Sequence, residues 1–563
     1  MVFLLTALNA KYIHSNPAVY SLRSFAGENA KYVQIAEYTI NNRMEDILED
    51  IYRRKPDVIG FSCYIWNIAM IREIITELHK LRPELPIFLG GPEVTYDAGK
   101  LMQEYPFLTG IFIGEGEATF AEVVSLYADG RPEEELLRIP GLMLRNGMTA
   151  ERVPLDLTKI PFLYEDMDPF ANRIIYYETQ RGCPFCCSYC LSSIEKKVRF
   201  RNMDVVKKEL QFFLDRKVKQ VKFVDRTFNC NHEHAMAIWQ YLYENDNGVT
   251  NFHFEIAGDL LREDELALIG KMRPGLVQFE IGVQSTNPDT LREIRRVMDI
   301  KKLKTVVEAL KKTGNVHVHL DLIAGLPYEN YESFARSFDE VYAMEPDQLQ
   351  LGFLKVLKGS YMAEKAKEYG LTFTDSPPYE VLCTKWLSFM EVRRLKRIEE
   401  MVEIYHNSGQ FVHTLPVLLF HYKEKGGAFA FFEALAKYYE EQGFFVTTPS
   451  RVYRYQAILA FAKEVDEENE PLYRELLTFD LYSRENMKSR PDFAADLKLY
   501  RDEIHALKLP HTAHAEMFTY SVWEKDVHNV KKLTGHELVV FDYENRHPLT
   551  REAAVKVLRK ENG

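Results

Sequence analysis

Residues 181–190 read RGCPFCCSYC and place four of the chain's seven cysteines within eight positions. Two metal-binding interpretations fit this spacing. Cys183, Cys187 and Cys190 form C-x3-C-x2-C, which supplies three thiolates to an iron–sulfur cluster. Alternatively, two C-x2-C pairs, Cys183 with Cys186 and Cys187 with Cys190, form knuckles for tetrahedral zinc. The sequence around the motif decides between them.

The cysteines follow directly after IIYYETQ (174–180), which reads as a buried strand, so they occupy a single loop. Zinc knuckles separate their cysteine pairs by about a dozen or more residues, and here the adjacent Cys186 and Cys187 would have to converge on one ion. Three spaced thiols suit a [4Fe–4S] cluster whose fourth iron is open to a further ligand. We therefore predict a cluster on Cys183, Cys187 and Cys190, with zinc as the alternative.

The cysteine loop opens a series of strand-like segments separated by helical ones. VVKKELQFFLDR (205–216) and LKTVVEALKKTG (303–314) have helical apolar spacing. This alternation predicts a partial (β/α)6 barrel. The predicted strands lie in IIYYETQRG (174–182), VKQVKFVDRTF (218–228), FHFEIAGDL (252–260), LVQFEIGVQS (276–285), VHVHLDLIAGLP (316–327) and QLQLGFLKVL (348–357).

The N-terminal part repeats the same alternation and predicts an α/β fold with a Rossmann-like, doubly wound parallel sheet. In such a sheet ligands bind at the carboxyl ends of the strands. The predicted strands lie in VFLLTALN (2–9), KYVQIAEYTI (31–40), DVIGFSCYIWN (57–67), PIFLGGPEV (86–94) and GIFIGEGEA (110–118). The predicted helices lie in MEDILEDIYRRK (44–55), AMIREIITELHKL (69–81) and ATFAEVVSLYADG (118–130).

A chain of 563 residues exceeds what one hydrophobic core supports, and changes of pattern divide it into four parts. Residues 1–140 form the Rossmann-like domain, residues 141–170 an extended linker with prolines, and residues 171–372 the barrel. Helical periodicity then dominates, as in AFAFFEALAKYYEEQG (428–443). We therefore predict a helix-rich C-terminal domain over residues 373–563.

Composition restricts the classes of function. The 71 basic and 83 acidic residues give a net charge of -12, which argues against general nucleic-acid binding. No apolar run approaches the roughly 20 residues that span a bilayer, and the N-terminus lacks the basic lead of a signal peptide. These features predict a cytoplasmic protein, in which clustered cysteines bind metal more readily than they form disulfides.

The segment GCPFCCSYC, with the aromatic Tyr189 before the third cysteine, resembles the signature of radical S-adenosylmethionine (SAM) enzymes. FVDRTF (223–228), FEIGVQS (279–285), LIAGLPYE (322–329) and LGFLKVLKG (351–359) match the strand motifs of that barrel in the same order. The N-terminal domain resembles the cobalamin-binding domain that precedes the barrel in cobalamin-dependent members. The resemblance continues into a C-terminal region typical of one uncharacterised subfamily.

The N-terminal domain departs from the cobalamin domains of methionine-synthase type. Those carry an Asp-x-His-x-x-Gly loop whose histidine binds cobalt, whereas here the first strand leads into NAKYIHSNP (9–17), and His14 lacks the partners. This agrees with the radical SAM members, in which the cobalt commonly has no protein histidine. The resemblance implies three cofactors, a [4Fe–4S] cluster, SAM and cobalamin.

The activity implied by the resemblance is methylation of an unactivated carbon in a small molecule. The open iron binds SAM, an electron cleaves SAM to methionine and a 5′-deoxyadenosyl radical, and that radical takes a hydrogen from the substrate. Methylcobalamin then delivers the methyl group, while the protein orients the cofactors and excludes water. The expected partners are the substrate and a reducing donor such as flavodoxin or ferredoxin, with neither a membrane nor a nucleic acid.

By the same resemblance, SAM contacts lie at the ends of the barrel strands. Tyr189 either contacts the adenine or packs on the cluster loop, and Asp225 either binds the SAM amino group or caps a helix. Glu255 is expected at the ribose hydroxyls, since a carboxylate in an apolar strand needs a polar partner. The remaining predicted contacts with SAM or substrate are Gly282, Gln284 and Ser285.

In the first domain, the corrin ring and its nucleotide tail are expected along the strand ends. Tyr64 or Trp66 is the candidate to cover the lower face of the cobalt, and Trp66 equally suits a core position at a helix start. Glycines at these ends allow close approach of a ligand to the backbone. The predicted cobalamin contacts are Ser62, Tyr64, Trp66, Gly90, Gly91, Gly114 and Glu115.

Two other functions stay open from the sequence. A cobalamin-binding radical SAM enzyme could perform a rearrangement, ring closure or oxidation without methyl transfer, and a zinc- or corrinoid-binding module could be non-catalytic. Methylthiolation of tRNA is excluded, because it needs three cysteines ahead of the barrel for a second cluster. Only Cys63 precedes Cys183 in this chain.

Overall fold

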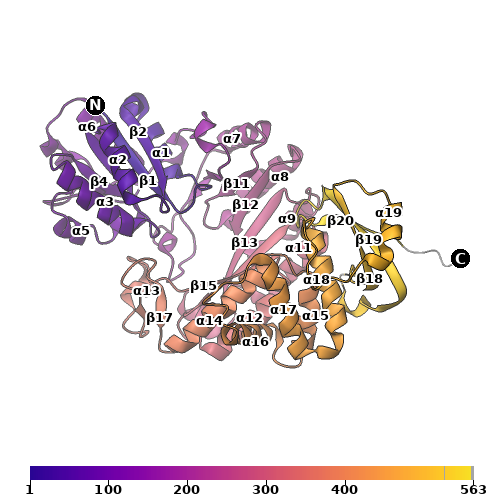
Figure 1. Ribbon diagram of the computed structural model, residues 1–563. Coiled ribbons are helices and arrows are strands. Elements are labelled where there is room, and N and C mark those ends of the chain that lie inside the picture. The colour runs from indigo at the N-terminus through magenta and orange to yellow at the C-terminus, as the bar shows by residue number, and fades with distance from the viewer. Residues whose placement is uncertain (525, 559–563) are drawn as a thin grey trace.

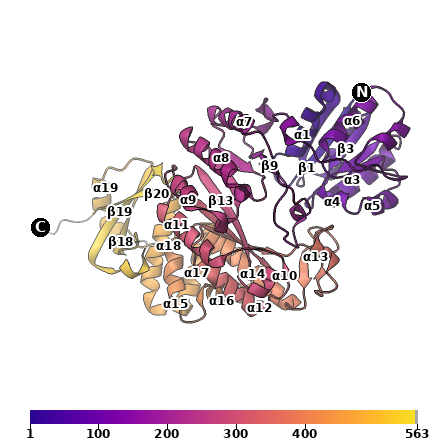
Figure 2. The same ribbon diagram turned by 180° about the vertical axis from the view of Figure 1, so that it is seen from behind.

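The computed structural model describes residues 1–524 and 526–558. An α/β domain at one end is followed by a parallel barrel, a helical region and a small sheet at the other end (Figure 1). The view from behind shows the barrel between the N-terminal domain and the C-terminal sheet (Figure 2). No helix within the described ranges has both the length and the apolar composition needed to cross a bilayer.

The N-terminal sheet has the strand order β2-β1-β3-β4-β5-β6-β7. Strands β1 to β5 are parallel and confirm the doubly wound sheet predicted from the sequence; β1 is buried throughout, because helices cover both faces. The strands are β1 (Phe3–Asn9), β2 (Val33–Thr39), β3 (Val58–Ser62), β4 (Ile87–Gly90), β5 (Gly110–Phe112), β6 (Leu142–Leu144) and β7 (Gly147–Met148). The helices are α1 (Pro17–Phe25), α2 (Met44–Arg54), α3 (Ile68–Leu81), α4 (Pro92–Thr95), α5 (Ala98–Glu104) and α6 (Glu117–Ala128).

The antiparallel pair β6 and β7 extends one edge of this sheet. It occupies the start of the stretch predicted as a linker, where strands of three and two residues are too short to leave a periodic pattern. At the other side, the order β2-β1-β3 places the reversal of strand order between β1 and β3. Open α/β sheets bind ligands at such a switch point.

The central sheet is parallel in the order β15-β14-β13-β12-β11-β8 and confirms the partial (β/α)6 barrel. Its strands are β8 (Ile175–Tyr177), β11 (Gln220–Phe223), β12 (Asn251–Ile256), β13 (Val277–Gln284), β14 (His317–Ala324) and β15 (Gln348–Phe353). The outer helices include α7 (Met203–Asp215), α8 (His232–Glu244), α9 (Glu263–Ile269), α11 (Ile300–Thr313) and α12 (Tyr331–Tyr342). A short ladder, β9 (Gln180–Arg181) with β10 (Arg199–Phe200), follows β8.

The C-terminal region begins with helices and ends in a sheet. The helices are α14 (Phe389–Val402), α15 (Thr414–Tyr422), α16 (Gly427–Glu441), α17 (Arg451–Val465), α18 (Glu470–Arg484) and α19 (Arg501–Ala506). The strands β18 (Ala513–Tyr520), β19 (Lys532–Arg546) and β20 (Ala553–Leu558) pair antiparallel. Helices dominate this region up to α19, which confirms the helix-rich fold, but the sheet that follows was not predicted; β-branched and aromatic residues such as those of ELVVF (537–541) favour strands there. Residues 559–563 lie outside the described ranges.

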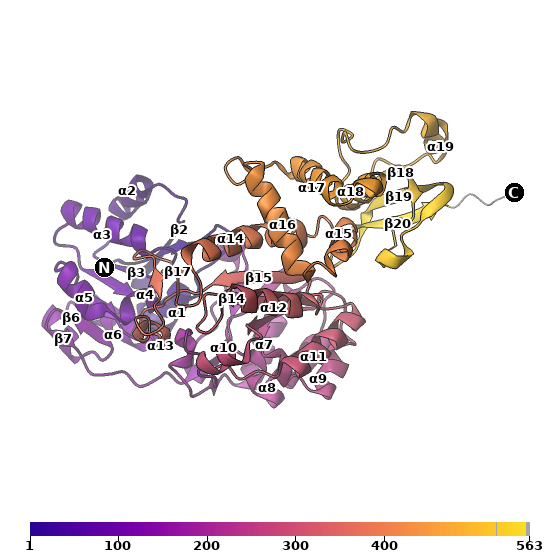
Figure 3. The same ribbon diagram turned by 90° about the horizontal axis from the view of Figure 1, so that it is seen from below.

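The helical region covers the exposed edge of the barrel. Figure 3 shows α14 running along the barrel at β15, and the two elements are in contact. Beyond α14, the Asn407 side chain exchanges two hydrogen bonds of 2.9 Å with the Leu349 backbone of β15. An edge strand that is capped in this way cannot pair with another chain. The C-terminal region is therefore placed against the barrel by backbone hydrogen bonding as well as by packing.

Candidate active site

The cysteine motif forms the loop between β9 and β10, at the carboxyl end of β8. Gly182 opens the loop with φ +93°, and a Cβ at this position would lie 2.5 Å from the Lys197 carbonyl oxygen. Only glycine fits there without strain. The Cys183 N–H donates to the Glu195 carbonyl at 3.0 Å, so the first cysteine is tied to the returning chain.

The thiols fit a cluster better than a single metal ion. Among the described residues, no three cysteine sulfurs lie within 4.8 Å of one another. A tetrahedral zinc ion with Zn–S bonds of about 2.3 Å requires sulfur atoms roughly 3.8 Å apart. Cys183 and Cys187 are buried, and Cys190 is half-buried. An open set of shielded thiols is what a multi-iron cluster needs, and this favours the first of the two interpretations of the motif.

Arg296 connects the cysteine loop to the barrel. Its Nη1 lies 3.6 Å from Cys187 Sγ and 3.4 Å from the Tyr189 hydroxyl, and its Nη2 donates to the Gly282 carbonyl of β13. Burial raises the pKa of the Cys187 thiol, and Arg296 opposes this by favouring the thiolate. No sequence pattern indicates Arg296, because only the tertiary fold brings it to the loop.

Asp225 lies after β11 and is fully buried. Its carboxylate accepts hydrogen bonds of 2.6–2.9 Å from the Thr179 N–H and hydroxyl and from the Gln180 N–H. His234 Nε2 lies 2.9 Å from the same Thr179 hydroxyl. Asp225 therefore anchors the chain that enters the cysteine loop, and it is not a helix cap. Its contact with SAM stays a prediction.

At the end of β13, Gln284 lines a cavity and Ser285 turns away from it. Gln284 has φ +73° beside a bulge in the β13–β14 pairing, and a Cβ at Gly282 would collide with its amide group. Strained backbone of this kind is common at ligand sites. Ser285 is fully buried and donates to Glu329 at 2.7 Å, so its hydroxyl supports the loop.

Charged side chains fill the inside of the barrel. Glu280 accepts from Lys222 Nζ at 3.1 Å and lies 2.9 Å from His253 Nε2; burial raises the pKa of Glu280, but these partners outweigh it and lower it to about 2. His319 Nε2 lies 3.0 Å from Asp321. These charged and histidine side chains inside the barrel were not predicted from the sequence, although they occur at every second position of their strands.

The predicted ribose contact Glu255 belongs to the same interior. It lies on β12, and Arg226 Nη1 is 3.9 Å away. Burial raises the pKa of Glu255, which the positive charge of Arg226 partly offsets. The expectation that this carboxylate needs a polar partner is met only loosely, so its oxygens retain acceptor capacity.

In the N-terminal domain, the predicted cobalamin residues gather at the carboxyl ends of β3, β4 and β5. The rings of Tyr64 and Trp66 stack with centroids 4.4 Å apart. Trp66 is 44% exposed and donates to the Leu8 carbonyl, which rules out the core position that the sequence also allowed. The Ser62 hydroxyl accepts from Asn16 at 2.9 Å, so the loops after β1 and β3 are joined at the switch point.

The predicted glycines play different parts. Gly91 has φ +121°, and a Cβ there would collide with the Cys63 carbonyl oxygen. Gly90 packs against the Phe112 side chain, with 3.2 Å between its notional Cβ and that of Phe112. Gly114 has φ +73° and faces open space. Of these three, Gly114 leaves room for a ligand beside the backbone.

Glu115 pairs with the barrel. It lies 2.5 Å from Arg199 Nη2 and 3.2 Å from Arg181 Nη1, while Arg181 also pairs with Glu117 at 2.5 Å and Glu178 at 2.9 Å. Burial raises the pKa of Glu115, but the hydrogen bonds from Arg199 and the Leu155 N–H and the charge of Arg181 together outweigh it, so the pKa is lowered overall. Because the two arginines form the β9–β10 ladder, the loop after β5 is tied to the base of the cysteine loop.

Two further contacts join the domains. Lys358, which follows β15, lies 3.3 Å from Glu93 and 2.8 Å from Asp97 in the region after β4. His14, which follows β1, lies 2.6 Å from the Tyr176 hydroxyl on β8. The carboxyl edge of the N-terminal sheet therefore faces the carboxyl ends of the barrel strands.

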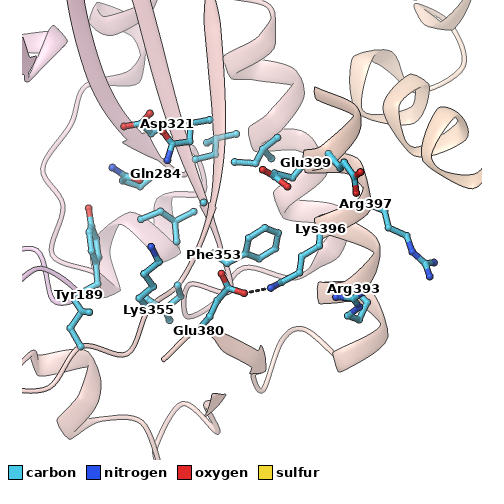
Figure 4. A pocket seen from close by; sticks show the side chains of 18 of the residues that line it. Tyr189, Gln284, Asp321, Phe353, Lys355, Glu380, Arg393, Lys396, Arg397 and Glu399 are labelled. Carbon is cyan, nitrogen blue, oxygen red and sulfur yellow. Dashed lines mark hydrogen bonds and ion pairs between the residues drawn. The ribbon is translucent and has the colours of Figure 1, made fainter. Parts of the chain in front are cut away.

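A cavity of about 880 Å³ lies at the carboxyl ends of β13 to β15 (Figure 4). Tyr189, Gln284 and Asp321 line it on the side of the barrel and cysteine loop, and Glu399 of α14 lines it from the opposite side. The volume is in the range of pockets for small molecules. Since Tyr189 is part of the cysteine motif, the cavity borders the loop that carries the cluster ligands.

Three family models match consecutive parts of the chain. Residues 4–124 match the B12 binding domain, residues 177–341 the radical SAM superfamily, and residues 367–558 a protein family of unknown function, DUF4080. The chain therefore joins a B12-binding domain to a radical SAM domain. The two models confirm the B12-binding and radical SAM domains expected from the sequence.

The characterised relatives are distant. The cobalamin-dependent radical SAM methyltransferase TokK of Streptomyces tokunonensis is 26% identical over 350 residues, 56% of this chain and 50% of TokK. The anaerobic magnesium-protoporphyrin IX monomethyl ester cyclase of Rubrivivax gelatinosus is 22% identical over 344 residues, 56% of this chain and 61% of the cyclase. The match to TokK thus spans about half the length of that protein.

Among solved structures, the radical SAM methyltransferase TsrM from Kitasatospora setae, with cobalamin and a [4Fe-4S] cluster bound, is similar with a TM-score of 0.55 and 15% identity. The likeness covers 67% of this chain and 78% of TsrM. It confirms the fold predicted for the cobalamin-type domain and the barrel. The chain is accordingly homologous to cobalamin-dependent radical SAM methyltransferases.

The cysteine assignment predicts which substitutions abolish iron binding. After anaerobic reconstitution with iron and sulfide, Cys187→Ala is expected to lose most of its iron, because one of three thiolate ligands is removed. Cys186→Ala, the adjacent cysteine, is expected to retain the wild-type content of about four irons. Iron, zinc and sulfide analysis measures this, and zinc in place of iron would contradict the assignment.

The buried network of Asp225, Thr179 and His234 at the entrance of the cysteine loop predicts an unusually low pKa for His234. Burial lowers the pKa of His234 to about 4, whereas an unfolded chain protonates histidine near about 6.5. Protons taken up only by the unfolded state reduce stability as the pH falls through this window, by up to about 1.4 kcal/mol per pH unit. In histidine-labelled NMR, the signal missing from His234→Gln is expected not to titrate between pH 8 and 5. Titration of that signal within this range would refute the buried network.

Proposed function

We propose that this protein is a cobalamin-dependent radical SAM enzyme that methylates an unactivated carbon of a small-molecule substrate. The observation that carries the proposal is the position of Tyr189, which belongs to the cysteine motif and lines the cavity. The base of the same loop is paired with Glu115 of the B12-binding domain. Cluster ligands, cavity and cobalamin-domain edge therefore adjoin one another.

The cofactors would supply the difficult chemistry. The cluster would donate the electron that cleaves SAM, and methylcobalamin would donate the methyl group. The chain's residues bind, orient and shield. We assign Cys183, Cys187 and Cys190 to the cluster, and Arg296 to stabilising the Cys187 thiolate and fixing the loop against β13. A positive group beside a ligand sulfur also tunes the potential of a cluster.

We assign SAM to the strand ends beside the cysteine loop. The Gln284 side-chain oxygen is buried and has no hydrogen-bond partner among the described residues, so a ligand can donate to it. Glu255, whose nearest cation is 3.9 Å away, remains the candidate for the ribose hydroxyls. Asp225 has its oxygens committed to Thr179 and Gln180 and serves as a positioning residue.

We assign cobalamin to the carboxyl edge of the N-terminal sheet, at the switch point. The stacked pair Tyr64 and Trp66 offers an exposed aromatic face, and Gly114 offers free space beside the backbone. His14 is held by Tyr176, which agrees with a cobalt that has no histidine ligand from this chain. A reducing protein such as flavodoxin or ferredoxin is the proposed electron donor.

A second function has specific support. The Rubrivivax gelatinosus relative is named a cyclase, so relatives of this chain include an enzyme whose printed name does not describe methyl transfer. Ring closure or oxidation at the same site would need the same cluster, SAM and cavity. The fate of the SAM methyl group distinguishes this function from methylation.

The proposal predicts the products of SAM. Reconstituted protein with hydroxocobalamin, a chemical reductant and methyl-deuterated SAM is expected to form 5′-deoxyadenosine and, only when cobalamin is present, S-adenosylhomocysteine. Cys187→Ala is expected to lose 5′-deoxyadenosine, with Cys186→Ala as the matched control, and mass spectrometry measures both nucleosides. 5′-Deoxyadenosine alone would favour the second function. Neither product, from protein with full iron and corrinoid, would reject both.

A further inference from the structure

The charges that α14 contributes to the cavity are unevenly paired. Lys396 pairs with Glu380, and Arg397 pairs with Glu440 on α16. Glu399 and Glu400 also line the cavity, and neither has an ion-pair or hydrogen-bond partner among the described residues. Lys396 and Arg397 are thus committed elsewhere, whereas Arg393, the third cation of this helix in the cavity lining, is exposed and has no ion-pair partner among the described residues. Two carboxylates of the same helix line the cavity without an ion-pair partner.

Glu399 carries most of the electrostatic cost. Figure 4 shows its side chain directed from α14 toward the part of the cavity that Asp321 and Gln284 line. Burial, and then the neighbouring Glu403 and Glu400, raise its pKa to about 7. A partly buried carboxylate without a partner is unfavourable, and such groups are concentrated at binding sites, where a ligand supplies the missing charge.

Neither Asp321 nor Lys355, which also line the cavity, provides Glu399 with an ion-pair partner. Asp321 lies 3.0 Å from His319 Nε2, so it already has a partner. Lys355 has no ion-pair partner among the described residues, but it lies on the other wall, near Tyr189 and Phe353 (Figure 4). The unpaired carboxylates are therefore at the α14 wall, which also carries the exposed Arg393, and the unpaired Lys355 is near the cysteine loop.

The arrangement suits an organic cation better than a metal ion. Glu399 and Glu400 belong to no group of three potential ligand atoms within 4.8 Å among the described residues. A divalent ion would need several more oxygen ligands. An ammonium group needs only hydrogen-bond acceptors at one end, and the aromatic and aliphatic lining, which includes Phe353 and Phe445, can receive the rest of such a molecule.

We propose that the cavity takes a substrate with a protonated amine and that Glu399 of α14 binds this amine. The inference rests on the proposed function only in treating the cavity as the substrate site. It gives the C-terminal region a role, because the residue that selects the charge of the substrate comes from α14. The amine end then lies at the α14 wall, and the remainder extends toward Tyr189 and the cysteine loop.

Three probes of similar size and different charge test this on the reconstituted full chain: phenethylamine, 3-phenylpropanoate and 2-phenylethanol. Binding is measured by ligand-observed NMR titration. Wild type is expected to bind the amine at least about tenfold more tightly than the other two, the gain typical of a charge-assisted hydrogen bond. Glu399→Gln is expected to remove this preference. Glu308→Gln, an exposed position of α11 outside the cavity, is the matched control and is expected to keep it.

Three binding results would contradict the proposed binding of an amine by Glu399. Lys355→Met is expected to leave amine binding unchanged; a preference for 3-phenylpropanoate, whether or not Lys355→Met abolishes it, would overturn the inference. Equal binding of the three probes, or no binding of the amine, would also overturn it. Thermal unfolding checks that each variant is folded. Because binding is measured without SAM cleavage, a protein that prefers the amine but does not cleave SAM would refute the proposed function and leave this inference standing.

Discussion

The ion-pair cluster around Arg181 is the interaction on which the site depends. Arg181 and Arg199 together meet Glu115, Glu117 and Glu178, and all five side chains are largely shielded from water. Removing charges from water is costly, and only full pairing offsets the cost. The cluster therefore tolerates one relative position of the two sheets. That position holds the loop after β5 against the base of the cysteine loop.

The barrel adds a second constraint from within. The carboxylate of Asp225 fixes the chain that enters the cysteine loop, and Arg296 holds the loop from the side of β13. Asp225 is fully buried and Arg296 is partly buried, so neither can exchange its partner for water without a penalty. Asp225 thus holds the entrance of the cysteine loop, the ion pairs of Arg181 hold its base, and Arg296 holds its centre. A cofactor bound there would meet a preformed set of ligands.

The cavity depends on all three parts of the chain being in place. The barrel supplies its floor, the cysteine loop supplies Tyr189, and α14 supplies the charged wall with Glu399. The edge of β15 is capped by Asn407, which keeps the helical region against the barrel. The region that matches a family of unknown function is therefore structurally part of the site.

The sequence by itself determined the local elements and the motif chemistry. Apolar runs mark strands such as β1 and β3, which are covered on both faces. Alternating apolar and polar residues mark barrel strands such as β13. The cysteine spacing and Gly182 likewise depend only on neighbours along the chain. The short strands β6 and β7 and the sheet β18 to β20 were missed, because short or half-exposed strands leave weak periodicity.

Only the tertiary structure decided which distant residues meet. Arg296 reaches the cysteines across 109 positions, and Glu115 reaches Arg199 across 84, so no local pattern could reveal either contact. The tertiary structure also divided the predicted site residues into two groups. Gln284 and Tyr189 line the cavity, whereas Asp225 and Ser285 make buried hydrogen bonds within the protein. The physical reason is that propensity acts between neighbours in sequence, whereas desolvation and charge pairing act between neighbours in space.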